Sequence, residues 1–95
     1  KTTTRVLVAM FDANTQAASL ELATKLRTSG ISTEVYPALD KLGKQFKLAD
    51  SKGIPYVIII GQEEQAKTSV TLKNMKTGEQ AMYDFAEMLR VIQKE

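Results

Sequence analysis

Lysines recur in the middle of the sequence at a spacing that suits the binding of phosphate groups. Lys41, Lys44 and Lys47 follow one another at three-residue intervals, which places their ammonium groups along one side of a helix. Residues 41–76 hold seven lysines against three carboxylates, although the formal net charge of the chain is only +2. A local basic surface of this kind attracts nucleic acids through counterion release. On charge alone, an ordinary solvated lysine face is the favoured alternative.

Two adjacent carboxylates, Glu63 and Glu64, follow the most apolar segment of the chain. Neighbours in a loop need not converge on one atom, so solvated charges are favoured over paired acid/base catalysis. A single carboxylate at a strand end suits another task, because it accepts hydrogen bonds from the amino or imino group of a base. Among the nearby aromatic residues, Tyr36 is a candidate for stacking on a base, whereas Phe46 is assigned to the core. The pattern indicates recognition without reaction.

The sequence lacks the residue types on which much enzyme chemistry depends. It contains no cysteine and no histidine, which excludes disulfides, thiolate chemistry, the usual zinc sites and the commonest general base. No glycine-rich phosphate motif occurs, and the third strand ends without the aspartate of a phosphoacceptor domain. No apolar stretch is long enough to predict a membrane span. We therefore expect no catalytic residue, no cofactor and no metal within this segment.

The elements that must position these side chains alternate between strands and helices. Residues 41–53 repeat apolar side chains at i, i+4 and i+7 and predict a helix, with Asp40 as its N-cap and Gly53 as its end. The β-branched run 56–60 predicts a strand that is covered on both faces. The remaining elements are expected as strands 5–11, 31–36, 70–74 and 79–83, helices 16–29 and 85–92, and a loop at 61–69.

This order, β-α-β-α-β-β-β-α, predicts an α/β fold with a five-stranded mixed sheet flanked by three helices. Two right-handed crossovers give a parallel core with strand order 2-1-3, and a hairpin extends the sheet with antiparallel pairing. Ninety-five residues, of which 43% are hydrophobic, fit one domain with one modest core. Open sheets of this kind bind ligands beyond the carboxyl ends of their parallel strands, which here are residues 11–14, 36–41 and 61–64.

The amino-acid sequences of two segments resemble those of a known family. KLGKQFKLADSKGIPYVIIIG at residues 41–61 and VTLKNMKTGEQ at residues 70–80 are similar to the C-terminal anticodon-binding domain of bacterial-type histidyl-tRNA synthetases. The resemblance implies a class II synthetase anticodon-binding fold over residues 1–95, a single domain cut from the C-terminus of a longer synthetase. The first residue, Lys1 in place of Met, agrees with that expectation.

The resemblance also implies partners. The domain is expected to bind the anticodon stem-loop of a histidine-specific tRNA, while a separate catalytic domain of a cytoplasmic, homodimeric parent attaches histidine with ATP and magnesium. The alternative is a synthetase-like regulatory or protein-interaction domain that keeps the fold without binding anticodons. An independent enzyme with an unrecognised site is a third hypothesis, which the absence of His and Cys disfavours.

Family positions carried onto this sequence give a set of candidate tRNA contacts. The set comprises Leu39, Asp40, Lys41, Lys44, Gln45, Lys47, Glu64 and Lys73. Glu64 and Lys73 are expected to contact bases. The three lysines of the predicted helix are expected to contact phosphates, because a flexible ammonium is a point charge without bidentate selectivity. Two positions depart from the family pattern, since Leu48 replaces a common Tyr and Thr68 replaces a common Gly.

Overall fold

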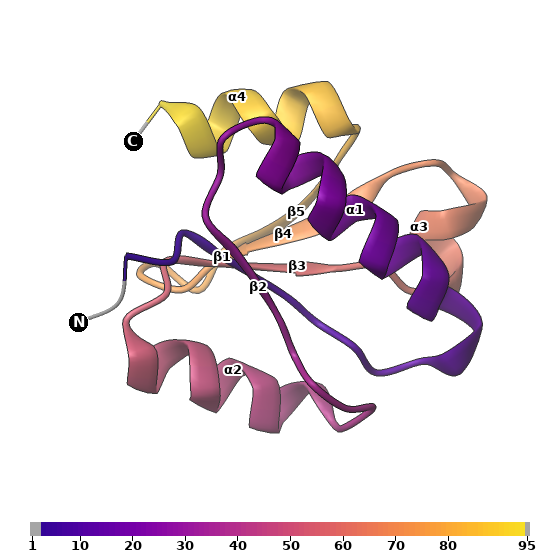
Figure 1. Cartoon of the computed structure of the whole chain (residues 1–95), viewed down its shortest axis with the longest axis horizontal. Helices are drawn as coiled ribbons and strands as arrows, with labels where there is room; N and C mark the ends of the chain where they lie inside the picture. Colours follow the sequence, from indigo (N-terminus) through magenta and orange to yellow (C-terminus); the bar gives the residue numbers. More distant parts are fainter. Residues whose placement is uncertain (1–2, 95) are drawn as a thin grey trace.

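The computed structural model describes residues 3–94 as an open sheet with helices on both faces (Figure 1). The elements are β1 (Val6–Val8), the 3-10 turn η1 (Ala13–Thr15), α1 (Gln16–Thr28), β2 (Thr33–Val35), α2 (Leu42–Lys52), β3 (Tyr56–Ile59), α3 (Gln62–Ala66), β4 (Val70–Asn74), β5 (Gln80–Tyr83) and α4 (Phe85–Gln93). The strand order is β2-β1-β3-β4-β5. β1 is parallel to β2 and β3, and the β4–β5 hairpin joins β3 in antiparallel pairing. The predicted mixed sheet is confirmed.

The two central strands are buried on both sides, as their unbroken apolar sequences predict. Alternate side chains divide between two core clusters. Val6, Ile58 and Leu72 pack with α1 and α4 on what we call the closed face. Leu7 and Val57 pack with α2 on what we call the open face. Figure 1 shows α1 and α4 on one side of the sheet and α2 alone on the other.

The open face owes its name to the part of the hairpin that α2 leaves uncovered. Lys73 lies opposite Val57 on β3 and opposite Gln80 on β5, and directly opposed residues project from the same face. Thr71 lies opposite Met82 on the same face. Met82 is 41% exposed and Gln80 is exposed as well. The β4–β5 part of this face therefore presents polar and apolar side chains to solvent.

Helix α2 ends as the sequence predicts but begins one residue later than expected. Gly53 closes it in the left-handed region with φ 74°, a conformation that glycine adopts without a steric penalty. The predicted N-cap, Asp40, is wrong by one position, because Lys41 is the cap residue and makes no side-chain capping bond. Asp40 instead accepts a hydrogen bond from the Lys41 main-chain N–H at 2.8 Å.

The expected loop at 61–69 is the main error in the predicted fold, because residues 62–66 form the short helix α3. The described residues thus contain four α-helices in place of the three predicted. Glu64 stabilises the start of α3 by accepting the Gly61 N–H at 2.9 Å, the carboxylate half of a capping box. After the helix, Thr68 has φ 54°, a left-handed conformation that glycine adopts without a steric penalty.

The last helix is fixed at both ends. Asp84 and Glu87 exchange reciprocal side-chain to main-chain hydrogen bonds of 2.8 and 3.0 Å at its start, so the predicted Asp84 cap is confirmed. Near its end, Arg5 Nη2 donates to the Ile92 carbonyl at 2.9 Å. This bond joins the residue that precedes β1 to the last helix.

Candidate nucleic-acid interface

The start of α2 meets the carboxyl end of β1 at one edge of the sheet. The Asp40 main-chain N–H donates to the Met10 carbonyl at 3.1 Å, which ties the two segments together. A shallow hollow lies beside this junction and is lined by Phe11, Leu39, Asp40, Lys41 and Leu42; we call these five residues the loop edge. Three of the sequence-predicted contact residues, Leu39 to Lys41, therefore lie together where open α/β sheets bind ligands.

Gln45 is completely buried beneath the loop edge. Its Oε1 accepts the Met10 N–H at 2.8 Å, and its Nε2 donates to the carbonyls of Met10 and Asp40, each at 2.9 Å. A buried amide with three partners is satisfied. The structure therefore removes Gln45 from the predicted set of tRNA contacts and gives it another role, in which it fixes the two segments that carry the loop edge.

Asp40 carries the negative charge of the loop edge. The pKa of the Asp40 carboxyl is held below its ordinary value, chiefly by the hydrogen bond from the Lys41 main-chain N–H. The Tyr36 hydroxyl and Lys44 act in the same direction. The Tyr36 hydroxyl donates to Asp40 Oδ2 at 3.2 Å. Desolvation, followed by this bond to Asp40, raises the pKa of Tyr36. The Tyr36 ring packs against the open-face core, so this stacking candidate serves the local structure.

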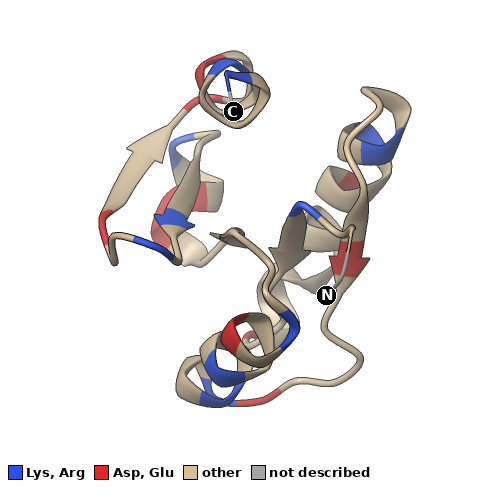
Figure 2. Ribbon diagram, turned by 90° about the vertical axis from the view of Figure 1, so that its left-hand side faces the viewer, with Lys and Arg blue, Asp and Glu red and all other residues tan. Residues whose placement is uncertain are grey.

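The predicted phosphate-binding lysines are all on the surface, with Lys41 at the N-cap of α2 and the other two on the helix itself. Lys41, Lys44 and Lys47 are exposed, and Figure 2 shows basic segments recurring along α2. Lys44 Nζ lies 3.8 Å from Asp40 Oδ2 with 70% of its side chain exposed. An exposed pair of this length contributes little stability, so Lys44 can exchange this partner for a phosphate at small cost. The arrangement suits binding of a polyanionic backbone.

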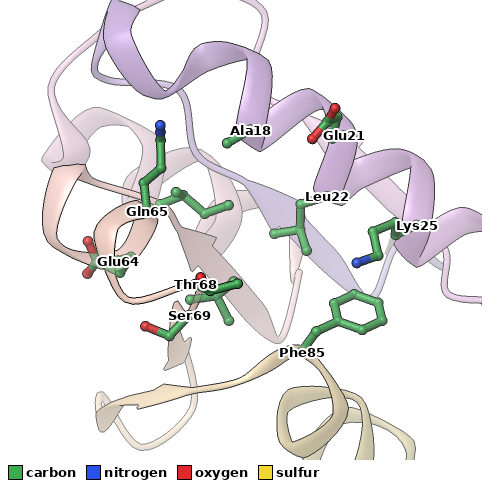
Figure 3. A pocket seen from close by; sticks show the side chains of 11 residues that line it. Ala18, Glu21, Leu22, Lys25, Glu64, Gln65, Thr68, Ser69 and Phe85 are labelled. Atoms are coloured by element: carbon green, nitrogen blue, oxygen red, sulfur yellow. The ribbon is translucent and has the colours of Figure 1, made fainter.

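Glu64 lies at the start of α3. Its carboxylate points away from a hollow between α1 and α3 that is described below (Figure 3). Oε1 accepts the Gly61 N–H at 2.9 Å, and Oε2 accepts the Thr71 hydroxyl at 2.6 Å. Partial burial acts to raise the pKa of Glu64, but the bonds from Thr71 and Gly61 outweigh it and hold the pKa below its ordinary value. The group is therefore an oriented carboxylate, and each oxygen keeps a second lone pair for a base amino or imino group.

Lys73 projects from the middle of β4 on the open face, between the sheet and α2. Its Nζ lies 4.8 Å from the centre of the Phe46 ring, a cation–π distance that favours one orientation of the ammonium. Phe46 packs against the open-face core, as predicted. Thr71 lies two residues from Lys73 on the same face and binds Glu64. Glu64, Thr71 and Lys73 thus form one strip beside α2, which we call the β4 strip.

A second hollow lies on the other side of the sheet, between α1, α3 and the start of α4 (Figure 3). Ala18, Leu22 and Phe85 supply apolar walls, and Lys25 Nζ lies 4.5 Å above the Phe85 ring. Its volume of about 200 Å³ is below the range of most small-molecule sites. Glu64 is the one predicted contact residue within the described part of the chain that lines this hollow.

Within residues 3–94, no group of three or more His, Cys, Asp or Glu side chains is arranged to hold a metal ion. In the same part of the chain, no helix combines the length and the apolar character needed to cross a membrane. These observations leave the loop edge, the α2 lysines and the β4 strip as the candidate interface.

Comparison with known proteins gives a consistent set of relatives. A histidine–tRNA ligase of Cytophaga hutchinsonii is 43% identical over 86 residues, which cover 90% of this chain and 19% of the ligase. The ligase of Wolinella succinogenes is 44% identical over 79 residues, which cover 83% of this chain and 18% of the ligase. The chain thus spans about a fifth of the length of these relatives.

Solved structures agree with the sequence relatives. The histidyl-tRNA synthetase of Nostoc sp. PCC 7120 superposes with a TM-score of 0.92 at 30% identity, over 98% of this chain and 22% of that chain. The RNA-binding domain of threonyl-tRNA synthetase from Cryptosporidium parvum superposes with a TM-score of 0.88 over 96% of this chain and 23% of that chain. At 15% identity, the second likeness concerns the fold alone.

The family assignment follows from the extent of one further match. Residues 5–95 match the family described as anticodon binding domain, which includes every described strand and helix. The resemblance noted in the sequence is confirmed by this match, by the names of the relatives and by the superposition. The chain belongs to the anticodon-binding domain family, and it is similar to the corresponding segments of histidine–tRNA ligases.

Proposed function

We propose that this chain recognises the anticodon stem-loop of a histidine-specific tRNA. The observation that carries the proposal is the juxtaposition of the β4 strip with the exposed lysines of α2. The strip offers an oriented carboxylate at Glu64 and an ammonium at Lys73, which suit acceptor and donor positions on base edges. The lysines suit the phosphates that connect those bases. Family membership supports the anticodon as the part of the tRNA that is bound.

The remaining parts of the proposal concern the parent enzyme. Relatives about five times longer are named histidine–tRNA ligases. The chain would then act as the C-terminal domain of such a ligase, working in the cytoplasm as a homodimer. A separate catalytic domain of the same chain would use ATP and magnesium to attach histidine, while this domain contributes affinity and selection of the tRNA.

Binding to matched RNAs tests base recognition. We expect the full-length parent to bind the histidine anticodon stem-loop more tightly than a transcript with a swapped anticodon, and to lose affinity steeply with salt. Lys73→Ala and Glu64→Ala should each reduce this preference by about 5-fold to 150-fold, the range of one good base contact. Binding can be measured by fluorescence anisotropy.

The control is Lys25→Ala, which removes the same charge from α1 on the closed face and should leave the preference unchanged. Equal affinity of the wild-type parent for both anticodons would contradict base recognition. That result, together with capture of a protein partner by the β4 strip, would favour the regulatory or protein-interaction alternative.

A further inference from the structure

Phe11 is exposed in a place where its sequence context predicts burial. It follows the fully buried strand β1, yet 36% of its surface is accessible. Leu39, which is 46% exposed, lines the same hollow of the loop edge. Four large apolar side chains are exposed among residues 3–94, and Phe11 is the aromatic one. An exposed aromatic ring beside a second apolar side chain is the kind of feature that marks a binding surface.

The ring of Phe11 adjoins the carboxylate of Glu64 through Gly61. A Cβ built on Gly61 would lie 3.3 Å from Phe11 Cζ and 2.9 Å from Glu64 Oε1. Both atoms therefore border the same small space, which any larger residue at position 61 would fill. The loop edge and the β4 strip thus meet at the buried Gly61, with the tip of the Phe11 ring at one side of the glycine and a hydrogen-bond acceptor at the other.

The segments on either side of Phe11 are held in place. Gln45 binds both main-chain groups of Met10. On the other side, Asp12 accepts the Asn14 main-chain N–H at 2.9 Å, and Gln62 Nε2 lies 3.4 Å from Asp12 Oδ2. The main chain that carries the ring is therefore already ordered before a ligand covers it, which lowers the entropy cost of binding. The geometry favours a preformed platform.

We propose that Phe11 is a stacking platform for one unpaired nucleobase of the bound RNA. Leu39 would border the base, Lys41 would contact its phosphate, and Glu64 would face its polar edge. The charges favour this occupant over an apolar protein side chain, because Lys41 at the hollow and Lys44 beside it outnumber Asp40 and complement the phosphate that accompanies every base. The inference rests on the proposed function and extends it to a residue outside the predicted contact set.

Stacking contributes affinity with little choice among bases, because every base has a π-face. Phe11→Leu keeps an apolar side chain and removes the ring, so we expect it to weaken binding of the histidine anticodon stem-loop by about 5-fold to 150-fold. Phe11→Tyr should retain wild-type affinity. Leu20→Ala, at an exposed apolar residue of α1 on the closed face, should also leave affinity unchanged. Anisotropy titrations of the full-length parent measure all four proteins.

An abasic scan of the loop nucleotides identifies the stacked base. At one position, removal of the base should weaken binding by the wild-type protein. The Phe11→Leu variant should bind that abasic loop with the same affinity as the intact loop. Coupling at that position supports the platform whichever anticodon the wild-type protein prefers, so it separates this inference from the proposed function. If Phe11→Leu weakens intact and abasic loops equally at every position, or binds the intact loop like wild type, the inference is overturned.

Discussion

The same strands form both faces of the sheet, but the two faces differ in how completely helices cover them. On the closed face, Leu26, Met88 and Ile92 from two helices complete a core with exposures of 1% or less. On the open face, α2 covers the central strands and leaves Lys73 and Met82 of the hairpin accessible. Side chains on the closed face pack against one another, whereas several side chains on the open face remain accessible to a partner. The comparison predicts that stability and RNA binding can be changed separately.

The largest expected effect is on the closed face. Leu26→Ala removes a side chain with no exposed surface and should lower the free energy of unfolding by about 2 to 5 kcal/mol, because transfer and cavity costs add. Chemical denaturation measures the loss. RNA affinity of the fraction that stays folded should match wild type. A selective loss of anticodon preference in this variant would break the distinction between the faces.

Gln45→Glu tests the buried hydrogen bonds that Gln45 makes beneath the loop edge. The new carboxyl would face two carbonyl acceptors in a buried site, so its folded pKa should rise above its unfolded value. The variant is then least destabilised at acidic pH and loses stability as pH rises through the folded pKa. We expect a cost of about 1 to 3 kcal/mol at pH 8, measured by denaturation at several pH values.

Gln45→Met is the matched control, because it breaks the same hydrogen bonds without a titrating group. Its stability relative to wild type should not change with pH between about 5 and 8. If Gln45→Glu shows the same flat profile, the contacts of Gln45 with Met10 and Asp40 do not govern the loop edge.

Glu64→Gln should have a smaller effect on stability. Because hydrogen bonds hold the native pKa of Glu64 below the ordinary value, its stabilisation is present above pH of about 4.3 and is lost as pH falls through the native pKa. We expect a difference from wild type of about 1 kcal/mol at pH 7, which declines in acid. Thermal unfolding at pH 7 and pH 3 checks the sign, and a difference that grows in acid would contradict it.

The smallest effect is expected on the exposed side of α2. Lys47→Ala should leave unfolding unchanged and weaken all tRNAs alike, because a phosphate contact carries no sequence information. The slope of log affinity against log salt should fall in magnitude by about 0.7 to 0.9. Filter binding at several salt concentrations measures it. A preference for one anticodon that depends on Lys47 would show that α2 also reads bases.

The periodic elements were predictable because their apolar spacing matches the core they form. β4 has the predicted bounds, and Gly53 and Asp84 mark helix ends as expected. The sequence does not predict helix α3, because four of its five residues are polar and they carry no apolar stripe. Gly61 followed three residues later by Glu64 was the available signal. Short helices of this kind are defined by end contacts more than by periodicity.

The interface was harder to predict because polarity does not reveal exposure. The family resemblance places Gln45 among the RNA contacts, although Gln45 shares the helical stripe of Leu42 and Ala49, a spacing that directs it toward the core. The sequence pattern places Phe11 in an apolar strand, and only the three-dimensional arrangement shows that its ring reaches solvent. The remaining predicted RNA contacts stay predictions: Leu39, Asp40, Lys41, Lys44, Lys47, Glu64 and Lys73.

The bond between Arg5 and the Ile92 carbonyl also has a consequence for how the chain reaches this structure. Since the residue that precedes β1 is held by the last helix, parts of the sequence that lie 87 residues apart must meet before the closed face is complete. Contacts of such sequence separation carry a large loop-closure entropy and slow folding. The same proximity means that a short linker between residues 94 and 3, with new ends at the β4–β5 turn, should give a circular permutant that folds.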